Sequence, residues 1–166
     1  MNKDLMFSSK NYEWETPPEV FEWIDRKWEI TIDACATPGN AKCERFISPA
    51  EDFFQHNFIG EVAFMNRPYG RGIANFVEKA YTEALKPNTI FICLLPARTD
   101  TRWWHRYVMK SVAIYLIQGR IKFLNEDGER VASAPYPSAI VFFDGQSRTA
   151  GCPRFRAARF KYRKGT

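Results

Sequence analysis

The sequence of 166 residues predicts an α/β protein with a mostly parallel sheet, helices on both faces and a late antiparallel hairpin. Apolar residues at helical spacing alternate along the chain with short strand-like runs as far as residue 117. The run TIFICLL (89–95) is apolar at nearly every position, which is typical of a parallel strand buried on both faces. Two further strand-like runs follow with no helical pattern between them, and these predict the hairpin.

The predicted helices rest on apolar spacing and on residues that favour helix ends. Thr16 is the expected N-cap of the first helix, with Glu19 completing a capping box and prolines at the first helical positions. The segment Lys86-Pro87-Asn88 is expected to end the second helix. Helices are therefore predicted over residues 16–28, over residues 73–85, and from Thr99 or Asp100 through Val108.

The predicted strands are short and apolar, and turn signals separate them. They are predicted at 29–35, 61–65, 89–95 and 112–117, with a weak strand at 45–47. The hairpin is predicted from 121–123 and 138–143, with the turn NEDG and the loop APYP between them.

Length and composition predict one domain over residues 1–166, with residues 1–11 as a flexible N-terminus and 148–166 as a basic tail or edge strand. No apolar run approaches the roughly 20 residues of a membrane span, and the polar start of the chain is unlike a signal peptide. The four cysteines include no Cys-x-x-Cys pair, so we expect neither a metal site nor a disulfide framework. Reduced thiols then indicate a cytoplasmic protein.

Positive charge is concentrated at the carboxyl end of the chain. Seven of the 24 Lys and Arg residues follow residue 147 with no Asp or Glu among them, whereas the preceding chain carries all 19 acids. In RFRAARFKYRK the bases alternate with Phe160 and Tyr162, so one face of a strand would be cationic and the other aromatic. Two interpretations stay open: an edge strand whose charges prevent aggregation, or a strip that contacts nucleic-acid phosphates.

The stretch MNRPYG (65–70) ends an apolar run at a predicted strand end, where open α/β sheets bind ligands. The side-chain oxygen of Asn66 and the main-chain oxygen of Arg67 are two acceptors that can take both hydrogens of one planar amino group. Pro68 stiffens the loop, and Tyr69 offers a ring on which a flat base can stack. Taken alone, the stretch is better explained as an Asn-containing turn that proline ends.

Seven segments nevertheless occur in an order that resembles the small phage and prophage adenine-specific DNA methyltransferases, the Dam-type family. They are YEWETPPEVFEWID, TIDACATPGNAKCERF, EDFF, FMNRPYG, LLPARTDTRWWH, GRIKF and SAPYPSAIVFF, and they span residues 12–143. The resemblance implies a Rossmann-like fold that uses S-adenosylmethionine to methylate the exocyclic amino group of an adenine swung out of DNA. It also implies a phage or prophage protein that acts on DNA in the cytoplasm of a bacterial host.

The same resemblance assigns roles to individual residues. The catalytic loop that binds the amine is expected to be Asn66, Arg67, Pro68 and Tyr69. Cofactor contacts are expected from Thr16 and Pro17 near the methionine end, from Asp33, Ala34 and Cys35 at the polar groups, from Asp52 at the adenine, and from Asn66. The implied mechanism needs no metal, and no general base is evident.

Basic residues are expected to form the DNA-facing surface. Arg98 and Arg102 lie in a predicted strand-to-helix loop, where two arginines can clamp a phosphate. Arg120 lies in the segment that resembles a later family motif, and the resemblance favours DNA for the basic tail. DNA contacts are therefore expected from Arg98, Arg102, Arg120, Arg154, Arg156, Arg159, Lys161 and Arg163.

The chain departs from the family pattern at two positions. The glycine-rich turn of many methyltransferases is reduced to Gly39, and Arg67 replaces the first proline of Asn-Pro-Pro-Tyr. A guanidinium about 6 Å from the cofactor's sulfonium would repel it by about 3 kcal/mol at an effective dielectric of about 20. Three outcomes stay open: Arg67 slows the enzyme, it turns outward to a DNA phosphate, or it marks an inactive variant. The alternative function is therefore a module that binds DNA or S-adenosylmethionine without turnover.

Overall fold

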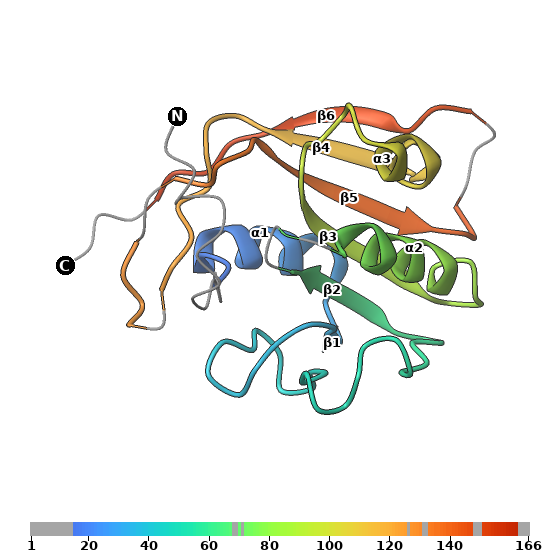
Figure 1. Cartoon of the computed structure of the whole chain (residues 1–166), viewed down its shortest axis with the longest axis horizontal. Coiled ribbons are helices and arrows are strands. Elements are labelled where there is room, and N and C mark those ends of the chain that lie inside the picture. Colours follow the sequence, from blue (N-terminus) through green and yellow to red (C-terminus); the bar gives the residue numbers. More distant parts are fainter. Residues whose placement is uncertain are drawn as a thin grey trace.

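The computed structural model describes residues 15–67, 70, 72–125, 127–130, 133–147 and 151–162. Helices and strands alternate over the first two thirds of this part, and strands follow (Figure 1). The elements, in chain order, are α1 (Pro18–Trp28), β1 (Ile32–Asp33), β2 (Val62–Asn66), α2 (Ile73–Glu83), β3 (Ile90–Pro96), α3 (Arg102–Arg106), the 3-10 helix η2 (Val108–Lys110), β4 (Ala113–Ile117), β5 (Ser138–Asp144) and β6 (Arg154–Ala158).

In the described part of the chain, six strands form one sheet in the order β1-β2-β3-β5-β4-β6 (Figure 1). β1, β2 and β3 are parallel neighbours, as are β4 and β6, while β5 is antiparallel to both β3 and β4. All strands except β5 therefore point the same way. We call the side where these five strands finish the carboxyl end of the sheet, and the opposite side the amino end.

Helices cover both faces of this sheet because alternate strand residues point to opposite sides. Phe64 and Ile92 pack in one core with residues of α1, whereas their neighbours Met65 and Cys93 pack in another with residues of α2 and α3. All four side chains are almost completely buried. The predicted α/β class, with a mostly parallel sheet and helices on both faces, is therefore confirmed.

The predicted antiparallel addition is confirmed for residues 138–144 but not for residues 121–123. β5 lies inside the sheet, between β3 and β4, and residues 121–123 form no strand. Phe123 is 1% exposed in the core on the α1 side, and the backbone of Leu124 exchanges two hydrogen bonds with Glu15. The alternating apolar residues of this segment therefore reflect burial under α1 and not pairing with β5.

The first predicted strand is shorter than expected. β1 contains only Ile32 and Asp33. Glu29 is the C-cap of α1 and has a left-handed φ of 51°, so it lies outside the strand. Asp33 also forms a parallel bridge with Phe46, and this bridge is what remains of the weak strand predicted at 45–47.

The three predicted helices are present, with changes at their ends. The N-cap of α1 is Pro17 instead of Thr16, and Glu19 forms an ion pair with Arg130 at 2.6 Å instead of completing a capping box. α3 stops at Arg106, and the chain continues as η2. Within the described ranges, no helix is long and apolar enough to cross a membrane.

Ion pairs balance buried charge at the amino end of the sheet. Glu83, the last residue of α2, is 3% exposed, and its carboxylate accepts hydrogen bonds from Lys79 at 2.6 Å and Lys86 at 2.7 Å. It also accepts one from the Phe58 N–H at 3.1 Å. Burial alone would raise the pKa of Glu83, but these hydrogen bonds outweigh burial and lower it. The cluster ties the end of α2 to the loop before β2.

Candidate active site

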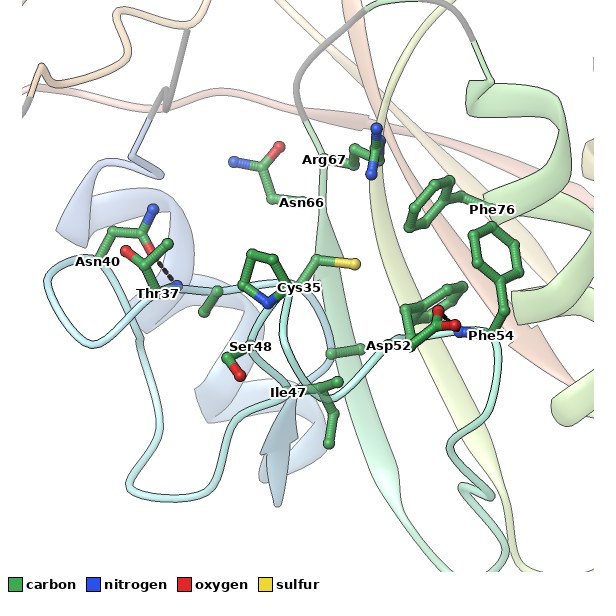
Figure 2. Close-up of a pocket in the computed structure, with 14 residues that line it drawn as sticks. Cys35, Thr37, Asn40, Ile47, Ser48, Asp52, Phe54, Asn66, Arg67 and Phe76 are labelled. Atoms are coloured by element: carbon green, nitrogen blue, oxygen red, sulfur yellow. Dashed lines mark hydrogen bonds between the residues drawn. The ribbon is translucent and has the colours of Figure 1, made fainter. Parts of the chain in front are cut away.

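A cavity of about 480 Å³ opens where β1 and β2 finish, at the carboxyl end of the sheet (Figure 2). This volume is in the range of small-molecule sites. One side comes from the loop after β1, and the other from the loop before β2, the end of β2 and the start of α2 (Figure 2). The lining residues are Ala34, Cys35, Ala36, Thr37, Asn40, Ile47, Ser48, Pro49, Asp52, Phe53, Phe54, Asn66, Arg67 and Phe76.

Asp33 organises the loop after β1 from behind the cavity wall. It is 3% exposed, and its two carboxylate oxygens accept hydrogen bonds from the N–H groups of Cys35 at 3.3 Å and Lys42 at 3.1 Å. Burial raises the pKa of Asp33, and the two backbone hydrogen bonds offset this only in part. Cys35 and Ala34 line the cavity themselves, so Asp33 acts on its shape through their backbone.

Asn66, the last residue of β2, is joined to the segment before α1. Its amide nitrogen donates a hydrogen bond to the hydroxyl oxygen of Thr16 at 2.8 Å. Thr16 is 3% exposed, so this contact lies at the inner side of the site. Two residues that are 50 positions apart in sequence, and that were both expected in the site, are thus brought together.

Arg67 turns to the other side of the cavity. Its guanidinium carbon lies 3.8 Å from the centre of the Phe76 ring. Figure 2 shows the two side chains next to each other. Phe76 stacks on Phe53 with ring centres 4.8 Å apart, and it meets Phe54 at a steep angle at 4.6 Å. The side chain therefore rests on an aromatic wall that α2 and the loop before β2 build together.

The cavity has one polar and one aromatic side. In Figure 2, Thr37 and Asn40 lie on one side, where the Thr37 N–H donates to the Asn40 side chain at 2.7 Å. Asp52 lies on the other side with Phe54 and Phe76. Asp52 has a φ of 55°, and its carboxylate accepts a hydrogen bond from the Phe54 N–H at 3.0 Å.

Several predicted DNA-binding residues lie at the carboxyl end of the sheet. Arg98 follows β3, with its guanidinium 4.9 Å from the ring centre of Tyr136. Arg120 follows β4 and donates a hydrogen bond to the main-chain oxygen of Ala134 at 3.1 Å. Arg102 is the exposed first residue of α3.

The basic residues around β6 are divided between the two ends of the sheet. Arg154 pairs with the first residue of β4 and lies at the amino end, and Arg156 is beside Tyr115 in the middle of the strand. Arg159 and Lys161 follow the strand at the carboxyl end. All four are exposed.

The remaining predicted site residues are Pro17, Pro68, Tyr69 and Arg163. Pro17 is buried as the N-cap of α1, whereas Pro68, Tyr69 and Arg163 lie outside the described residues. The sequence did not predict that the wall of Phe53, Phe54 and Phe76 lines the cavity, nor that Thr37, Asn40 and Ser48 do. The helical spacing of Phe76 indicates only a core position. A signal for Phe53 and Phe54 was present, because they follow Asp52 in EDFF (51–54), one of the seven segments that resemble the family.

A mostly parallel sheet with helices on both faces and a cavity at its carboxyl end defines a Rossmann-like α/β architecture. The family model described as DNA N-6-adenine-methyltransferase (Dam) matches residues 5–157. The chain is also 30% identical over 135 residues to the DNA N-6-adenine-methyltransferase of Haemophilus phage HP1 (strain HP1c1), covering 79% of this chain and 78% of the phage protein. The chain therefore belongs to the DNA N-6-adenine-methyltransferase (Dam) family.

Proposed function

We propose that this chain is an adenine-specific DNA methyltransferase that transfers a methyl group from S-adenosylmethionine to the amino group of an adenine swung out of DNA. The observation that carries the proposal is the place of Asn66, which ends β2 at the cavity with its amide nitrogen bonded to Thr16. The side-chain oxygen of an asparagine at this place can accept a hydrogen bond from a substrate amine. The family and the name of the phage relative support the same reaction.

The chain's part in this reaction is to position the amine. The side-chain oxygen of Asn66 and the main-chain oxygen of Arg67 accept hydrogen bonds from the two N–H groups of the amine. These hydrogen bonds orient the nitrogen lone pair toward the methyl group. Extruding the adenine costs a few kcal/mol, and we assign Tyr69 to stack on the extruded base. Bound S-adenosylmethionine would supply the methyl group for one in-line displacement, which would leave S-adenosylhomocysteine and release one amine proton to solvent, with no covalent intermediate on the protein.

The residues of the cavity fit S-adenosylmethionine, which supplies a methyl group activated on a sulfonium. Phe54 and Phe76 offer ring surfaces for its flat adenine, and Asp52 lies beside them with a carboxylate for polar groups. The opposite side, with Thr37 and Asn40, suits the polar part of the cofactor.

The proposal is tested with labelled S-adenosylmethionine and unmethylated plasmid DNA, together with calorimetry of cofactor binding. We expect label on the adenine amino group, and loss of at least about 100-fold in rate for Asn66→Ala with cofactor affinity largely unchanged. Asn57→Ala, an exposed asparagine in the loop before β2, is the matched control. Cofactor binding without turnover by the native chain would support the non-catalytic module instead.

Arg67 is tested by comparing the native chain with Arg67→Pro. Since the guanidinium rests on Phe76, we expect the two maximal rates to agree within about tenfold. If the guanidinium repelled the sulfonium as the sequence alone allowed, the proline variant would be faster by about two decades, because about 1.4 kcal/mol is a factor of ten. A gain of that size would support the interpretation of a slow enzyme.

A further inference from the structure

Other groups of the protein cover the ring of Phe76. Phe53 stacks on it with ring centres 4.8 Å apart and an angle of 17° between the planes, and the guanidinium carbon of Arg67 lies 3.8 Å from its centre. A carbon atom so close to a ring centre must lie over the face of the ring, since the atoms of the ring itself fill the space beside its edge. The face under Arg67 is therefore closed to a ligand unless the guanidinium moves away.

The guanidinium of Arg67 is in turn part of the cavity surface. Arg67 is half-buried and lines the cavity, and Figure 2 shows it next to Phe76, on the same side as Asp52 and Phe54. Burial raises the pKa of the Cys35 thiol, and the positive charge of Arg67 opposes this rise, so the charge acts inside the cavity. In the described part of the chain, no carboxylate forms an ion pair with Arg67. Among these residues, the guanidinium is therefore held by a ring and not by an opposite charge.

A guanidinium that rests on a ring offers a second flat face. The group is planar and more weakly hydrated than an ammonium group, so it stacks readily on aromatic rings. Within the described ranges, Phe76 is the one ring that Arg67 contacts, so the second face of the guanidinium can take a flat ligand. An adenine ring suits this face, because the π face of an aromatic ring attracts a cation and every nucleobase has such a face.

We propose that the side chain of Arg67 binds the cofactor: the adenine ring of S-adenosylmethionine stacks on the guanidinium, which Phe76 supports from behind. This inference rests on the proposed function. It refines the place of the adenine, which then meets the face of Phe76 only through Arg67. It also differs from the three outcomes that the sequence left open, in which the side chain repels the sulfonium, contacts a DNA phosphate or marks an inactive variant.

The positive charge of Arg67 is compatible with a cationic cofactor in this arrangement. The ribose of S-adenosylmethionine separates the adenine from the sulfonium, so a guanidinium under the adenine is not in contact with the second cation. Stacking of this kind is the same before and during methyl transfer. It therefore changes the affinity for the cofactor and not the maximal rate.

The first experiment measures three Kd values by calorimetry, for S-adenosylmethionine, S-adenosylhomocysteine and methylthioadenosine. All three ligands contain adenine, but only S-adenosylmethionine carries the sulfonium charge. We expect Arg67→Ala to weaken the binding of all three by about tenfold, because the stacking surface is lost. Repulsion of the sulfonium would give the opposite sign: tighter binding of S-adenosylmethionine by up to about 100-fold, with the other two unchanged. That result, or three unchanged Kd values, would overturn the proposal.

Two further variants separate the flat surface from the charge. Arg67→Lys keeps the charge but loses the plane, so we expect its Kd values to stay at least about threefold weaker than those of the native chain. Arg106→Ala is the matched control, because Arg106 is exposed and its guanidinium rests on a ring away from the cavity, 5.5 Å from the centre of Tyr107. It should leave all three Kd values unchanged. Native affinity in Arg67→Lys would mean that the charge alone matters, and the stacking would be wrong.

A third readout detects the stacking itself and needs no DNA. The Nε–H signal of Arg67 is assigned in the NMR spectrum by its loss in Arg67→Lys. An aromatic ring over a guanidinium moves this signal upfield through its ring current. We therefore expect a further upfield shift when S-adenosylhomocysteine binds, and a signal that stays in place at saturation would overturn the proposal.

The possible outcomes also separate this inference from the proposed function. Weaker Kd values in Arg67→Ala, with a native chain that transfers no methyl group to DNA, would support the role of Arg67 and remove only the proposed reaction. Methyl transfer by the native chain, with unchanged Kd values in Arg67→Ala, would remove only the role of Arg67. A native chain that binds neither S-adenosylmethionine nor S-adenosylhomocysteine would overturn both.

Discussion

The two ends of the sheet hold their buried carboxylates in different ways. At the amino end, Glu83 is paired with two lysines and a backbone N–H, and its pKa is lowered. At the carboxyl end, Asp33 is equally buried but accepts hydrogen bonds from backbone N–H groups, and its pKa is raised. The charged form of Glu83 is therefore stabilised, whereas burial disfavours the charged form of Asp33.

The carboxylate at the amino end contributes to stability, whereas the carboxylate at the carboxyl end contributes to the binding site. The pairing at the amino end fastens α2 to the sheet without contributing a lining residue to the cavity. The carboxylate at the carboxyl end fixes a loop whose residues Ala34 and Cys35 line the cavity. Substitutions at the two ends should therefore change different measured quantities.

The largest effect is expected for Glu83→Ala. Removing this buried carboxylate leaves the Phe58 N–H without its acceptor and leaves Lys79 and Lys86 with neutral oxygens only, at a cost of about 3 kcal/mol in the free energy of unfolding. Urea denaturation measures this loss. Cofactor affinity, measured where the variant is still folded, should match the native chain, and a weakened affinity would contradict the separation of the two ends.

The next effect is expected for Asp33→Asn, which retains one carbonyl acceptor of the two oxygens. One of the bonds to Cys35 and Lys42 is lost, so the loop after β1 is less well ordered. We expect the Kd for S-adenosylmethionine to rise about tenfold, which is about 1.4 kcal/mol. The loss of unfolding free energy should be smaller than for Glu83→Ala, because a buried charge is removed. Calorimetry and urea denaturation on the same samples check both statements.

A smaller effect is expected from the basic residues at the two ends of β6. Arg159, at the carboxyl end, is on the side of the cavity, whereas Arg154 is at the amino end. Arg159→Ala should weaken binding to duplex DNA by about fivefold at 0.15 M salt and reduce the salt slope by about 0.9, as for one lost phosphate contact. Arg154→Ala is the matched control and should change neither. Equal losses would place DNA along the whole strand.

The smallest effects concern pH, and the two carboxylates give them opposite signs. The lowered pKa of Glu83 contributes stability above its ordinary value of 4.5, and this is lost as the pH falls. The raised pKa of Asp33 gives stability at acid pH that is lost as the pH rises above its ordinary value of 3.8. Glu83→Gln should therefore be most destabilising at neutral pH, and Asp33→Asn at acid pH. Urea denaturation at several pH values measures both trends, and trends of the same sign would contradict the comparison.

The sequence predicts the parts of the fold that depend on local pattern. The continuous apolar run of β3, the helical spacing of α2 and the apolar run of β2 are all local signals, and the structure confirms these elements, with β2 ending at Asn66, one residue later than predicted. The place of β5 between β3 and β4 depends on pairing between distant segments, which no local pattern specifies. The alternation at residues 121–123 is equally compatible with a strand and with burial under α1.

The site is predicted in part for the same reason. Asn66 and Arg67 stand out because polar residues directly follow an apolar strand. Thr16 carries the pattern of an N-cap, and the same hydroxyl that would cap α1 instead accepts a hydrogen bond from Asn66. The wall of Phe53 and Phe76 comes from two separate segments, so it exists only after both have packed.

The insertion of β5 also determines when the two parts of the sheet can join during synthesis of the chain. β3 ends at Pro96 and β4 ends at Ile117, yet each needs β5, residues 138–144, as its neighbour. Until the ribosome has released those residues, both strands have an unpaired side, and loops of dozens of residues must close before the sheet becomes continuous. A nascent chain shorter than this therefore exposes two apolar strands at once, which is the condition under which chaperones are needed most.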